Sequence, residues 1–236
     1  MTFDPSSRAK LNHHSLHHFT DDTLFCRVAR VVCHCACLPR KELYESWELA
    51  RRVRRRLRGR RIVEMAAGHG LVSLMLLLLD DSSPNAIAVD VRIPDSALKL
   101  RHAFLSQWPR LQGRIELRQD SLEVVTVSKD DVIVSAHACG SLTDLVLDSA
   151  ITARANVAVL PCCQSEAKCD TGGLLGWVDA ALAIDVTRAH RLRDAGYQVI
   201  TQTIPENITP KNRLLIGMIP SACPEPRMSA PIDSHP

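Results

Sequence analysis

The sequence predicts an α/β domain with a mostly parallel seven-stranded sheet, a helical N-terminal extension and an antiparallel hairpin at the C-terminal end of the sheet. Short apolar segments typical of buried strands alternate along the chain with longer segments of helical periodicity. This alternation is typical of a parallel sheet that helices cover on both faces. Near the C-terminus two strand segments follow each other without a helix between them, and this pair predicts the hairpin.

Composition excludes a membrane-spanning protein. The chain has 236 residues, enough for one large domain with a buried core, and 46% of them are hydrophobic. The longest apolar run, Leu71–Leu79, is interrupted by Ser73 and is shorter than the roughly 20 residues that cross a bilayer. The N-terminus lacks the basic-then-apolar pattern of a signal peptide. We therefore expect a cytoplasmic protein with no membrane contact, and nothing in the sequence indicates an obligate protein partner.

Residues 1–22 are polar and are expected to form a flexible tail. The tail contains four closely spaced histidines, His13, His14, His17 and His18. Such a spacing could hold a metal ion on a helix, but no acidic residue or cysteine lies at a suitable distance to complete the site. A flexible tail without a metal is the favoured interpretation.

Residues 23–58 are predicted to be helical. Four cysteines lie in this segment, Cys26, Cys33, Cys35 and Cys37. They lack the C-x-x-C spacing of a zinc site, and cysteine often packs as a small hydrophobic residue, so we interpret them as the buried core of a helix. The chain has nine cysteines, an odd number that favours reduced thiols over a disulfide framework.

Eight arginines lie close together just before the first predicted strand. From Arg51 to Arg61 the chain reads RRVRRRLRGRR, although the formal net charge of the whole chain is only +3. This block can bind RNA, because each phosphate that it neutralises releases counterions. It can equally be the solvated face of a helix predicted from Pro39 to Leu57, with Val53 and Leu57 turned inward at i, i+4 spacing. Both interpretations stay open.

Residues 59–220 carry the alternating pattern of the main domain. The expected strands are Arg61–Met65, Asn85–Val91, Arg114–Arg118, Asp131–Ser135, Asn156–Leu160, Tyr197–Ile204 and Arg213–Ile219. The expected helices between them are Leu71–Leu79, Asp95–Trp108, Leu142–Arg154 and Val178–Ala195. Residues 221–236 contain four prolines and are expected to be disordered.

The first predicted strand runs into a turn with the sequence Glu64-Met65-Ala66-Ala67-Gly68-His69-Gly70. Ligands of open α/β sheets bind beyond the carboxyl ends of strands, where small residues let the backbone approach them and the next helix offers free N–H groups. A dinucleotide fingerprint would need glycine at Ser73, and the charge of Glu64 would disfavour a pyrophosphate. S-adenosyl-L-methionine instead carries a sulfonium and an amino group, which an acid favours.

The pattern E-x-A-x-G-x-G resembles the first motif of class I methyltransferases, which have a Rossmann-like fold, with alanine in place of the first glycine. Asp90 ends the second strand and suits the two ribose hydroxyls of the cofactor, although it would also suit NAD. The resemblance places Asp120 and Ser121, after the third strand, around the adenine. The expected cofactor site therefore comprises Glu64, Ala66, Gly68, Gly70, Asp90, Asp120 and Ser121. A tight turn that binds nothing is the alternative.

Reactive side chains follow the fourth and fifth strands, which should line the same cleft. The candidate substrate-binding residues are Cys139, Thr143, Asp144, Cys162 and Cys163. Thr143 and Asp144 could instead cap the next helix. We expect no metal site: convergence of His137, Cys139, Cys162 and Cys163 on one zinc ion is disfavoured, because two of the cysteines are adjacent and His137 shares a strand end with Cys139.

The string H-x-C-G-x-x-T-D, starting at His137, and the later cysteine pair resemble the methyltransferase-domain family that includes the tRNA acceptor-stem ribose 2′-O-methyltransferase and related eukaryotic methyltransferase-like proteins. The resemblance covers roughly Lys41 to Pro220. It implies an S-adenosyl-L-methionine-dependent methyltransferase that acts on RNA, tRNA in particular. The family often has histidine after the cysteine pair, where this chain has Gln164, and we find no clear zinc-finger module of the kind that its RNA-modifying members carry.

His137 is the candidate catalytic base, because histidine can accept a proton near neutral pH if the methyl acceptor must lose one. Binding the methionine part of the cofactor is its alternative role. Three hypotheses for function remain: an RNA methyltransferase, a methyltransferase for a small molecule or a protein side chain, and a non-catalytic binding protein with the same fold.

Overall fold

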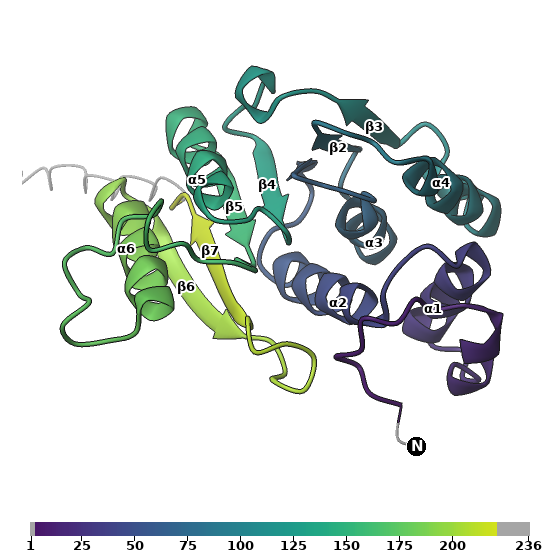
Figure 1. The fold of residues 1–236 in the computed structure, drawn as a ribbon. Coiled ribbons are helices and arrows are strands. Elements are labelled where there is room, and N and C mark those ends of the chain that lie inside the picture. The colour runs from purple at the N-terminus through teal and green to yellow at the C-terminus, as the bar shows by residue number, and fades with distance from the viewer. Residues whose placement is uncertain (1–2, 221–236) are drawn as a thin grey trace, which may run out of the picture.

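The computed structural model describes residues 3–220 of the chain. They form one seven-stranded sheet with the strand order β3-β2-β1-β4-β5-β7-β6 (Figure 1). The strands are β1 Arg61–Met65, β2 Ala86–Asp90, β3 Ile115–Gln119, β4 Asp131–Ser135, β5 Asn156–Val159, β6 Gln198–Thr203 and β7 Arg213–Met218. The predicted disordered tail, residues 221–236, lies outside the described residues.

Strands β1 to β5 pair in parallel, and β7 pairs antiparallel with both β5 and β6. The order runs outward from β1 in two directions, through β2 to β3 and through β4 to β5, so the carboxyl ends of β1 and β4 meet at the centre of one edge. This is the topological switch point at which open α/β sheets bind ligands. The predicted fold class is confirmed, including the hairpin at the C-terminal end.

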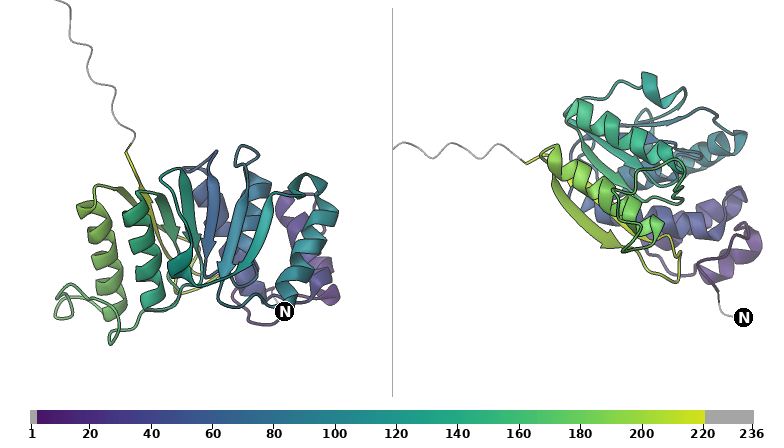
Figure 2. Two further views of the ribbon diagram at one scale, coloured as in Figure 1. Left: turned by 90° about the horizontal axis from the view of Figure 1, so that it is seen from above. Right: turned by 60° about the vertical axis from the view of Figure 1, so that its left-hand side comes forward.

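Residues 3–220 contain six α-helices. They are α1 Leu24–Cys35, α2 Arg40–Arg54, α3 Leu71–Leu79, α4 Asp95–Gln107, α5 Ser141–Ala153 and α6 Ala180–Asp194. Helices α2 to α4 share an apolar core with one face of the sheet, and α1 packs against α4 and α2. Helices α5 and α6 bury the other face, side by side along one end of the molecule (Figure 2). Neighbouring residues of β1 point to opposite faces, because side chains alternate along a strand: Ile62 belongs to the first core and Val63 to the second.

The N-terminal helices belong to the same core as α3 and α4. Thr23 caps α1 by accepting a hydrogen bond from the backbone N–H of Cys26 (3.3 Å). Cys26, Cys33 and Cys35 are buried in this helix, as predicted, whereas Cys37 is half-buried and follows the end of the helix. Among residues 3–220, none of the helices has the length and apolar character needed to cross a bilayer.

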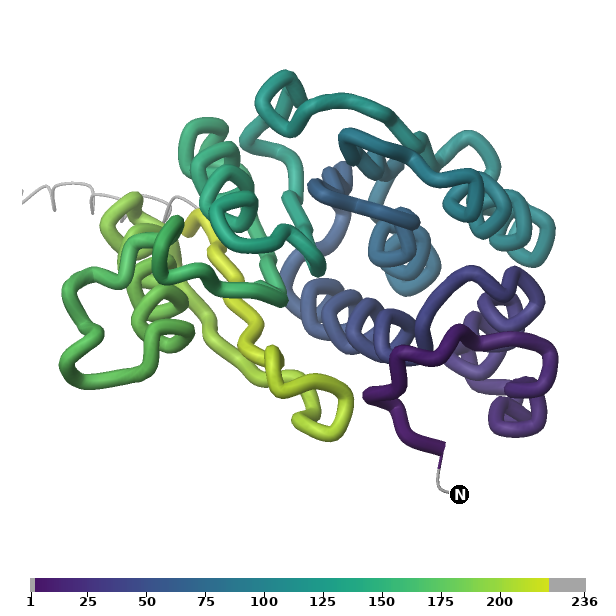
Figure 3. Tube along the Cα trace, viewed as in Figure 1, coloured from purple at the N-terminus to yellow at the C-terminus, as the bar shows by residue number. Residues whose placement is uncertain are grey.

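The expectation of a flexible tail over residues 1–22 needs correction for residues 3–22. The segment His13–His18 forms a short 3-10 helix, and Leu11 and Phe19 on either side are buried, with at most 2% exposed. The backbone N–H of Leu11 donates to the carbonyl of Leu38 (2.9 Å), and the segment lies against α1 in Figure 3. Two apolar side chains therefore anchor a segment that looks polar because of its exposed histidines.

Candidate active site

In the turn after β1, Gly70 is packed closely against the sheet, whereas Gly68 has open space beside it. Ala66, Gly68 and Gly70 have φ angles of +53°, +53° and +67°, in the left-handed region. A Cβ on Gly70 would lie 2.9 Å from Cδ2 of Leu117 and 3.1 Å from Cβ of Ala88, so the sheet leaves room for glycine only. A Cβ on Gly68 would meet nothing within 4 Å. The backbone of Gly68 is thus accessible to a ligand.

Glu64 supports this turn from inside the protein. Its side chain is buried, and it accepts a hydrogen bond from the backbone N–H of Ser73 (2.8 Å) in the first turn of α3. Burial raises the pKa of Glu64 to about 7, although hydrogen bonds from Ser73 and Val72 lower it in part. The expected cofactor-binding acid is therefore buried and holds the N-terminus of α3.

The structure brings the other predicted cofactor residues together beside the turn. Asp90 Oδ2 accepts a hydrogen bond from the backbone N–H of Gly68 (2.8 Å), and Oδ1 accepts one from the N–H of Arg92 (3.2 Å). The backbone N–H of Asp120 donates to the carbonyl of Asp90 (3.0 Å), and the carboxylate of Asp120 accepts from the N–H of Ser121 (2.9 Å). Two carboxylates thus flank the open turn.

Two further residues at this edge were not identified from the sequence. His69 joins the turn to two helices: its Nδ1 lies 3.3 Å from Oε1 of Glu42, and its Nε2 lies 3.0 Å from Oγ of Ser96. Val91 follows Asp90 and is 69% exposed, which is unusual for a valine at the end of a buried strand. The sequence signal that could have identified Val91 was its position directly after Asp90, the candidate ribose-binding acid.

Unpaired polar atoms lie at the carboxyl end of β4. The Nε2 of His137 and the Oγ of Ser135 are buried, and neither has a hydrogen-bond partner among residues 3–220. An unsatisfied buried polar group costs about 1–3 kcal/mol, so such atoms often meet a ligand. His137 itself is half-buried. The predicted catalytic residue therefore has a free nitrogen at the edge where the cofactor turn lies.

Thr143 and Asp144 have structural partners. The Thr143 hydroxyl is fully buried and donates to the carbonyl of Ala138 (2.6 Å). The Asp144 carboxylate accepts from Nε (3.0 Å) and Nη2 (2.8 Å) of Arg188, a guanidinium that is itself buried. Neither side chain caps α5, whose N-cap residue is Gly140, so the alternative of a capping role is wrong. Both residues fix the loop between β4 and α5.

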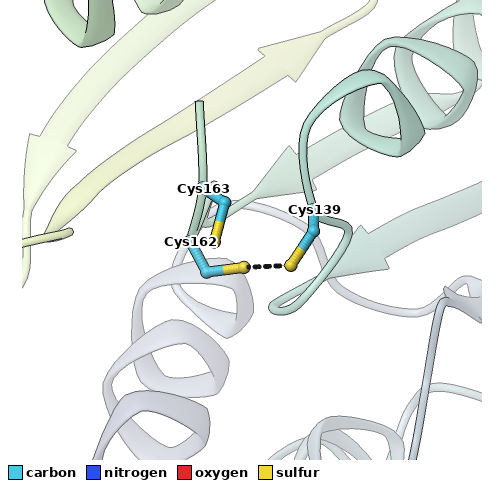
Figure 4. Close-up of side chains that lie close together, drawn as sticks. All are labelled: Cys139, Cys162 and Cys163. Atoms are coloured by element: carbon cyan, nitrogen blue, oxygen red, sulfur yellow. Dashed lines mark hydrogen bonds between the residues drawn. The ribbon is translucent and has the colours of Figure 1, made fainter. Parts of the chain in front are cut away.

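The three cysteines that follow β4 and β5 form a cluster (Figure 4). The sulfurs of Cys139, Cys162 and Cys163 all lie within 4.8 Å of one another, and the Cys139 and Cys162 sulfurs are 3.0 Å apart. Burial raises the pKa of the Cys139 and Cys162 thiols. We disfavoured convergence of all four residues on one zinc ion, and His137 indeed lies outside the group, but the three cysteines lie together. Two loops from neighbouring strands bring the sulfurs together, and adjacency in the chain does not prevent it.

Gln164, where the family often has histidine, points toward α6 and β7. Its Nε2 donates to Asp185 (3.1 Å), and its Oε1 accepts from Nζ of Lys211 (3.4 Å). Asp185 also accepts from Nε of Arg213 (2.7 Å). This polar network borders a cavity of about 510 Å³ between α6 and the strands β6 and β7, with Pro161 at its β5 side. The cavity lies three strands away from the glycine turn, near the cysteine pair.

The arginine block lies at the opposite edge of the sheet. Strand β1 begins at Arg61, which is at the end of the block, and the glycine turn follows the other end of the strand. Several of these arginines have acceptors within the chain: Arg52 pairs with Glu48, and Arg61 pairs with Asp131. Val53 is buried, as the interpretation as a helix face requires. Leu57 is buried as well, but α2 ends at Arg54 and not at the predicted Leu57, so Leu57 and the exposed Arg55 and Arg56 follow the helix.

A sequence model of the family described as "Methyltransferase domain" matches residues 41–170, more than half of the chain. The chain belongs to this methyltransferase-domain family. The match spans α2 to the cysteine pair, and so contains the glycine turn, both acids and the cysteine cluster. The prediction of a methyltransferase is confirmed at this level.

Two curated relatives are described as glutathione S-transferase C-terminal domain-containing protein homologs. The Drosophila melanogaster protein is 28% identical over 123 residues and the Drosophila pseudoobscura pseudoobscura protein is 27% identical over 131 residues. These matches cover 35% and 39% of this chain, but only 21% and 22% of the relatives. The chain thus corresponds to about a fifth of the length of these proteins.

Solved methyltransferases share the fold. An O-methyltransferase family protein from Burkholderia thailandensis superimposes with a TM-score of 0.51 at 18% identity, over 89% of this chain and 68% of the other. A tRNA methyltransferase of B. subtilis gives a TM-score of 0.50 at 17% identity, over 73% and 65%. At these identities the likeness concerns the fold, and it confirms the Rossmann-like methyltransferase architecture.

Proposed function

We propose that this protein transfers a methyl group from S-adenosyl-L-methionine. The observation that carries the proposal is the pairing of an open glycine with an anchored carboxylate: nothing lies within 4 Å of a Cβ placed on Gly68, and Asp90 is bonded to the N–H of that residue. A sulfonium nucleoside suits this edge, because the Asp90 carboxylate can accept hydrogen bonds from its ribose hydroxyls. The match to the methyltransferase-domain family supports this cofactor over a dinucleotide, which Asp90 alone would also suit.

Each residue of the edge has a part in binding the cofactor. Asp90 accepts hydrogen bonds from the ribose hydroxyls, using lone pairs that its two backbone partners leave free. Val91 offers apolar surface to the base, and Asp120 and Ser121 offer polar atoms at its rim. Ala66 and Gly70 shape the turn, and Glu64 holds the helix N-terminus behind it. The bound cofactor supplies an electrophilic methyl group.

His137 acts on the acceptor side of the proposed site. Its free Nε2 either takes a proton from the acceptor or holds the methionine part of the cofactor, and both roles use the same unpaired atom. Alignment of donor and acceptor accounts for most of the rate, since well-oriented reactants gain up to about 7–11 kcal/mol.

Calorimetric titration with S-adenosyl-L-methionine tests the cofactor assignment. We expect saturable binding to one site per chain, and the demethylated product should compete for it. A protein that is folded by circular dichroism but releases no heat with either compound would contradict the assignment and favour a non-catalytic binding protein.

The acceptor that we propose is RNA, tRNA in particular. The resemblance around His137 supports it, and the exposed Arg55 and Arg56 offer charge for phosphates. Because the block lies at the far edge of the sheet, the RNA would have to extend around the domain. Gel shifts with bulk tRNA should then weaken steeply with salt, and replacing Arg55 and Arg56 by alanine should reduce the salt slope.

A small-molecule acceptor is the second candidate, and the cavity of about 510 Å³ beside the cysteine pair favours it. Labelled methyl transfer into a fractionated extract separates the two acceptors. Label in RNA supports the first, and label in metabolites, with no salt-dependent tRNA binding, supports the second.

A further inference from the structure

The cysteine cluster is held by backbone contacts between two loops. The N–H of Gly140 donates to the carbonyl of Cys163 (3.1 Å), which fixes the loop of Cys139 against the cysteine pair. Closer to the sheet, the N–H of Leu160, just after β5, donates to the carbonyl of Ser135 at the end of β4 (2.9 Å). Main-chain hydrogen bonds at the ends of β4 and β5 therefore hold the two loops together. Figure 4 shows the three cysteine side chains that these loops bring together.

A buried cation supports the same loop from behind. Arg188 is 1% exposed and donates from Nη2 to the carbonyl of Gly140 (2.9 Å), the residue after Cys139. It also pairs with Asp144 in the first turn of α5. It pairs with Asp185 of α6 as well, so its charge is neutralised within the chain and its part here is to hold the loop of Cys139 in place beside the cysteine pair.

The spacing of the sulfurs fits a small thiophilic cation. Tetrahedral zinc with Zn–S bonds of about 2.3 Å separates its sulfur ligands by about 3.8 Å. The three sulfurs lie within 4.8 Å of one another, and the closest pair, Cys139 and Cys162, needs to open from 3.0 Å by less than about 1 Å. Cys139 and Cys163 are exposed and Cys162 is half-buried, so an ion can enter from solvent.

We propose that Cys139, Cys162 and Cys163 bind one Zn²⁺ ion as three thiolates and leave its fourth position open. Three S–H bonds lose their protons to solvent as three Zn–S bonds form, so no oxidant or reductant is required. Zinc sites with three protein ligands keep the fourth position for water or substrate. Here that position lies at the carboxyl edge of β4 and β5, next to the proposed acceptor side, and it suits a thiol or another soft donor.

A disulfide between Cys139 and Cys162 is the competing use of these thiols. It would consume two of the three sulfurs and would leave Cys163 without a role. It would also need an oxidant, which metal binding does not.

Metal titration of the full, reduced chain tests the site without the cofactor, so the result is independent of the proposed function. Chelator-treated protein is titrated with Co²⁺, whose absorption reports tetrahedral geometry and thiolate ligands. We expect one equivalent of Co²⁺ to bind with a thiolate charge-transfer band, and Zn²⁺ to displace it. The three variants Cys139→Ser, Cys162→Ser and Cys163→Ser should each weaken binding by more than the roughly 10–100-fold typical of losing an outer-shell partner.

Cys37→Ser is the matched control, because Cys37 is half-buried like Cys162 and belongs to the separate Cys35–Cys37 thiol pair. It should bind Co²⁺ like the unaltered chain, and circular dichroism should show all four variants folded. The proposal is overturned if reduced protein gives no thiolate charge-transfer band, or if Cys37→Ser abolishes that band while the cluster variants keep it. Isolation of a Cys139–Cys162 disulfide that takes up no metal after reduction would overturn it in favour of a redox pair.

Discussion

At the scale of single residues, Asp90 joins the shape of the turn to its proposed chemistry. Its carboxylate fixes the N–H of Gly68 and faces the edge where the ribose is proposed to lie. Asp90→Ala should weaken S-adenosyl-L-methionine binding by about 10- to 100-fold, the loss typical of a hydrogen bond to a charged group. Calorimetry measures the change. Asp130→Ala, at a 79% exposed carboxylate just before β4, should leave affinity unchanged; equal affinities for both variants would remove Asp90 from the site.

The buried Glu64 predicts an unusual dependence of stability on pH. Its pKa rises from the ordinary value of 4.5 to about 7 on folding, so the folded chain binds more protons than the unfolded chain between these values. The contribution of Glu64 to the free energy of unfolding should therefore fall as the pH rises from about 4.5 to 7, by on the order of 3 kcal/mol.

Glu64→Gln removes this titration and keeps an oxygen that can accept the bond from Ser73. Urea unfolding of both proteins at several pH values isolates the effect, because all other groups cancel in the difference. Relative to the unaltered chain, the variant should gain stability as the pH rises. A difference that does not change with pH would contradict a raised pKa.

At the scale of elements, the turn between β1 and α3 depends on Gly70 for two separable reasons. Any L-residue at its φ of +67° is strained, and a Cβ would also press against Leu117 and Ala88. Gly113 has a φ of +75° but open space around it, so Gly113→Ala measures the strain alone. Gly70→Ala should cost about 1–3 kcal/mol more than Gly113→Ala in urea unfolding. Equal losses would mean that the sheet accommodates the methyl group.

The bounds of helices and strands were predictable where sequence signals mark the ends of these elements. Strand β1, helix α3 and strand β4 have the predicted bounds, because glycine, acidic pairs or a change of hydrophobic period mark their ends. The pairing of Asp90 with the glycine turn followed from the rule that strand ends of a parallel sheet share an edge.

Contacts between distant segments were not predictable in the same way. The cysteine cluster depends on the bond from Gly140 to Cys163, and the roles of Thr143 and Asp144 depend on partners such as Arg188, 44 residues after Asp144. We expected Glu64 to contact the cofactor because of its place in the E-x-A-x-G-x-G motif. The motif does not reveal that this side chain is buried and bonded to Ser73 of α3. In each case the missing information was which partner the fold supplies.

At the scale of the whole molecule, the N-terminal segment completes the core on the α1–α4 face, although its composition suggests a tail. Phe19 is 2% exposed and packs edge-on against Phe3 and at a tilt of 75° against Phe25 of α1. Phe19→Ala should therefore lower the free energy of unfolding by about 3–5 kcal/mol, as for other buried aromatic residues. Thermal and urea unfolding, followed by circular dichroism, measure the loss. Thr20→Ala is the control, because this neighbour is exposed and should change stability by less than about 0.5 kcal/mol. If both variants unfold like the unaltered chain, the segment contributes nothing to the core and the flexible tail expected from the composition describes it correctly.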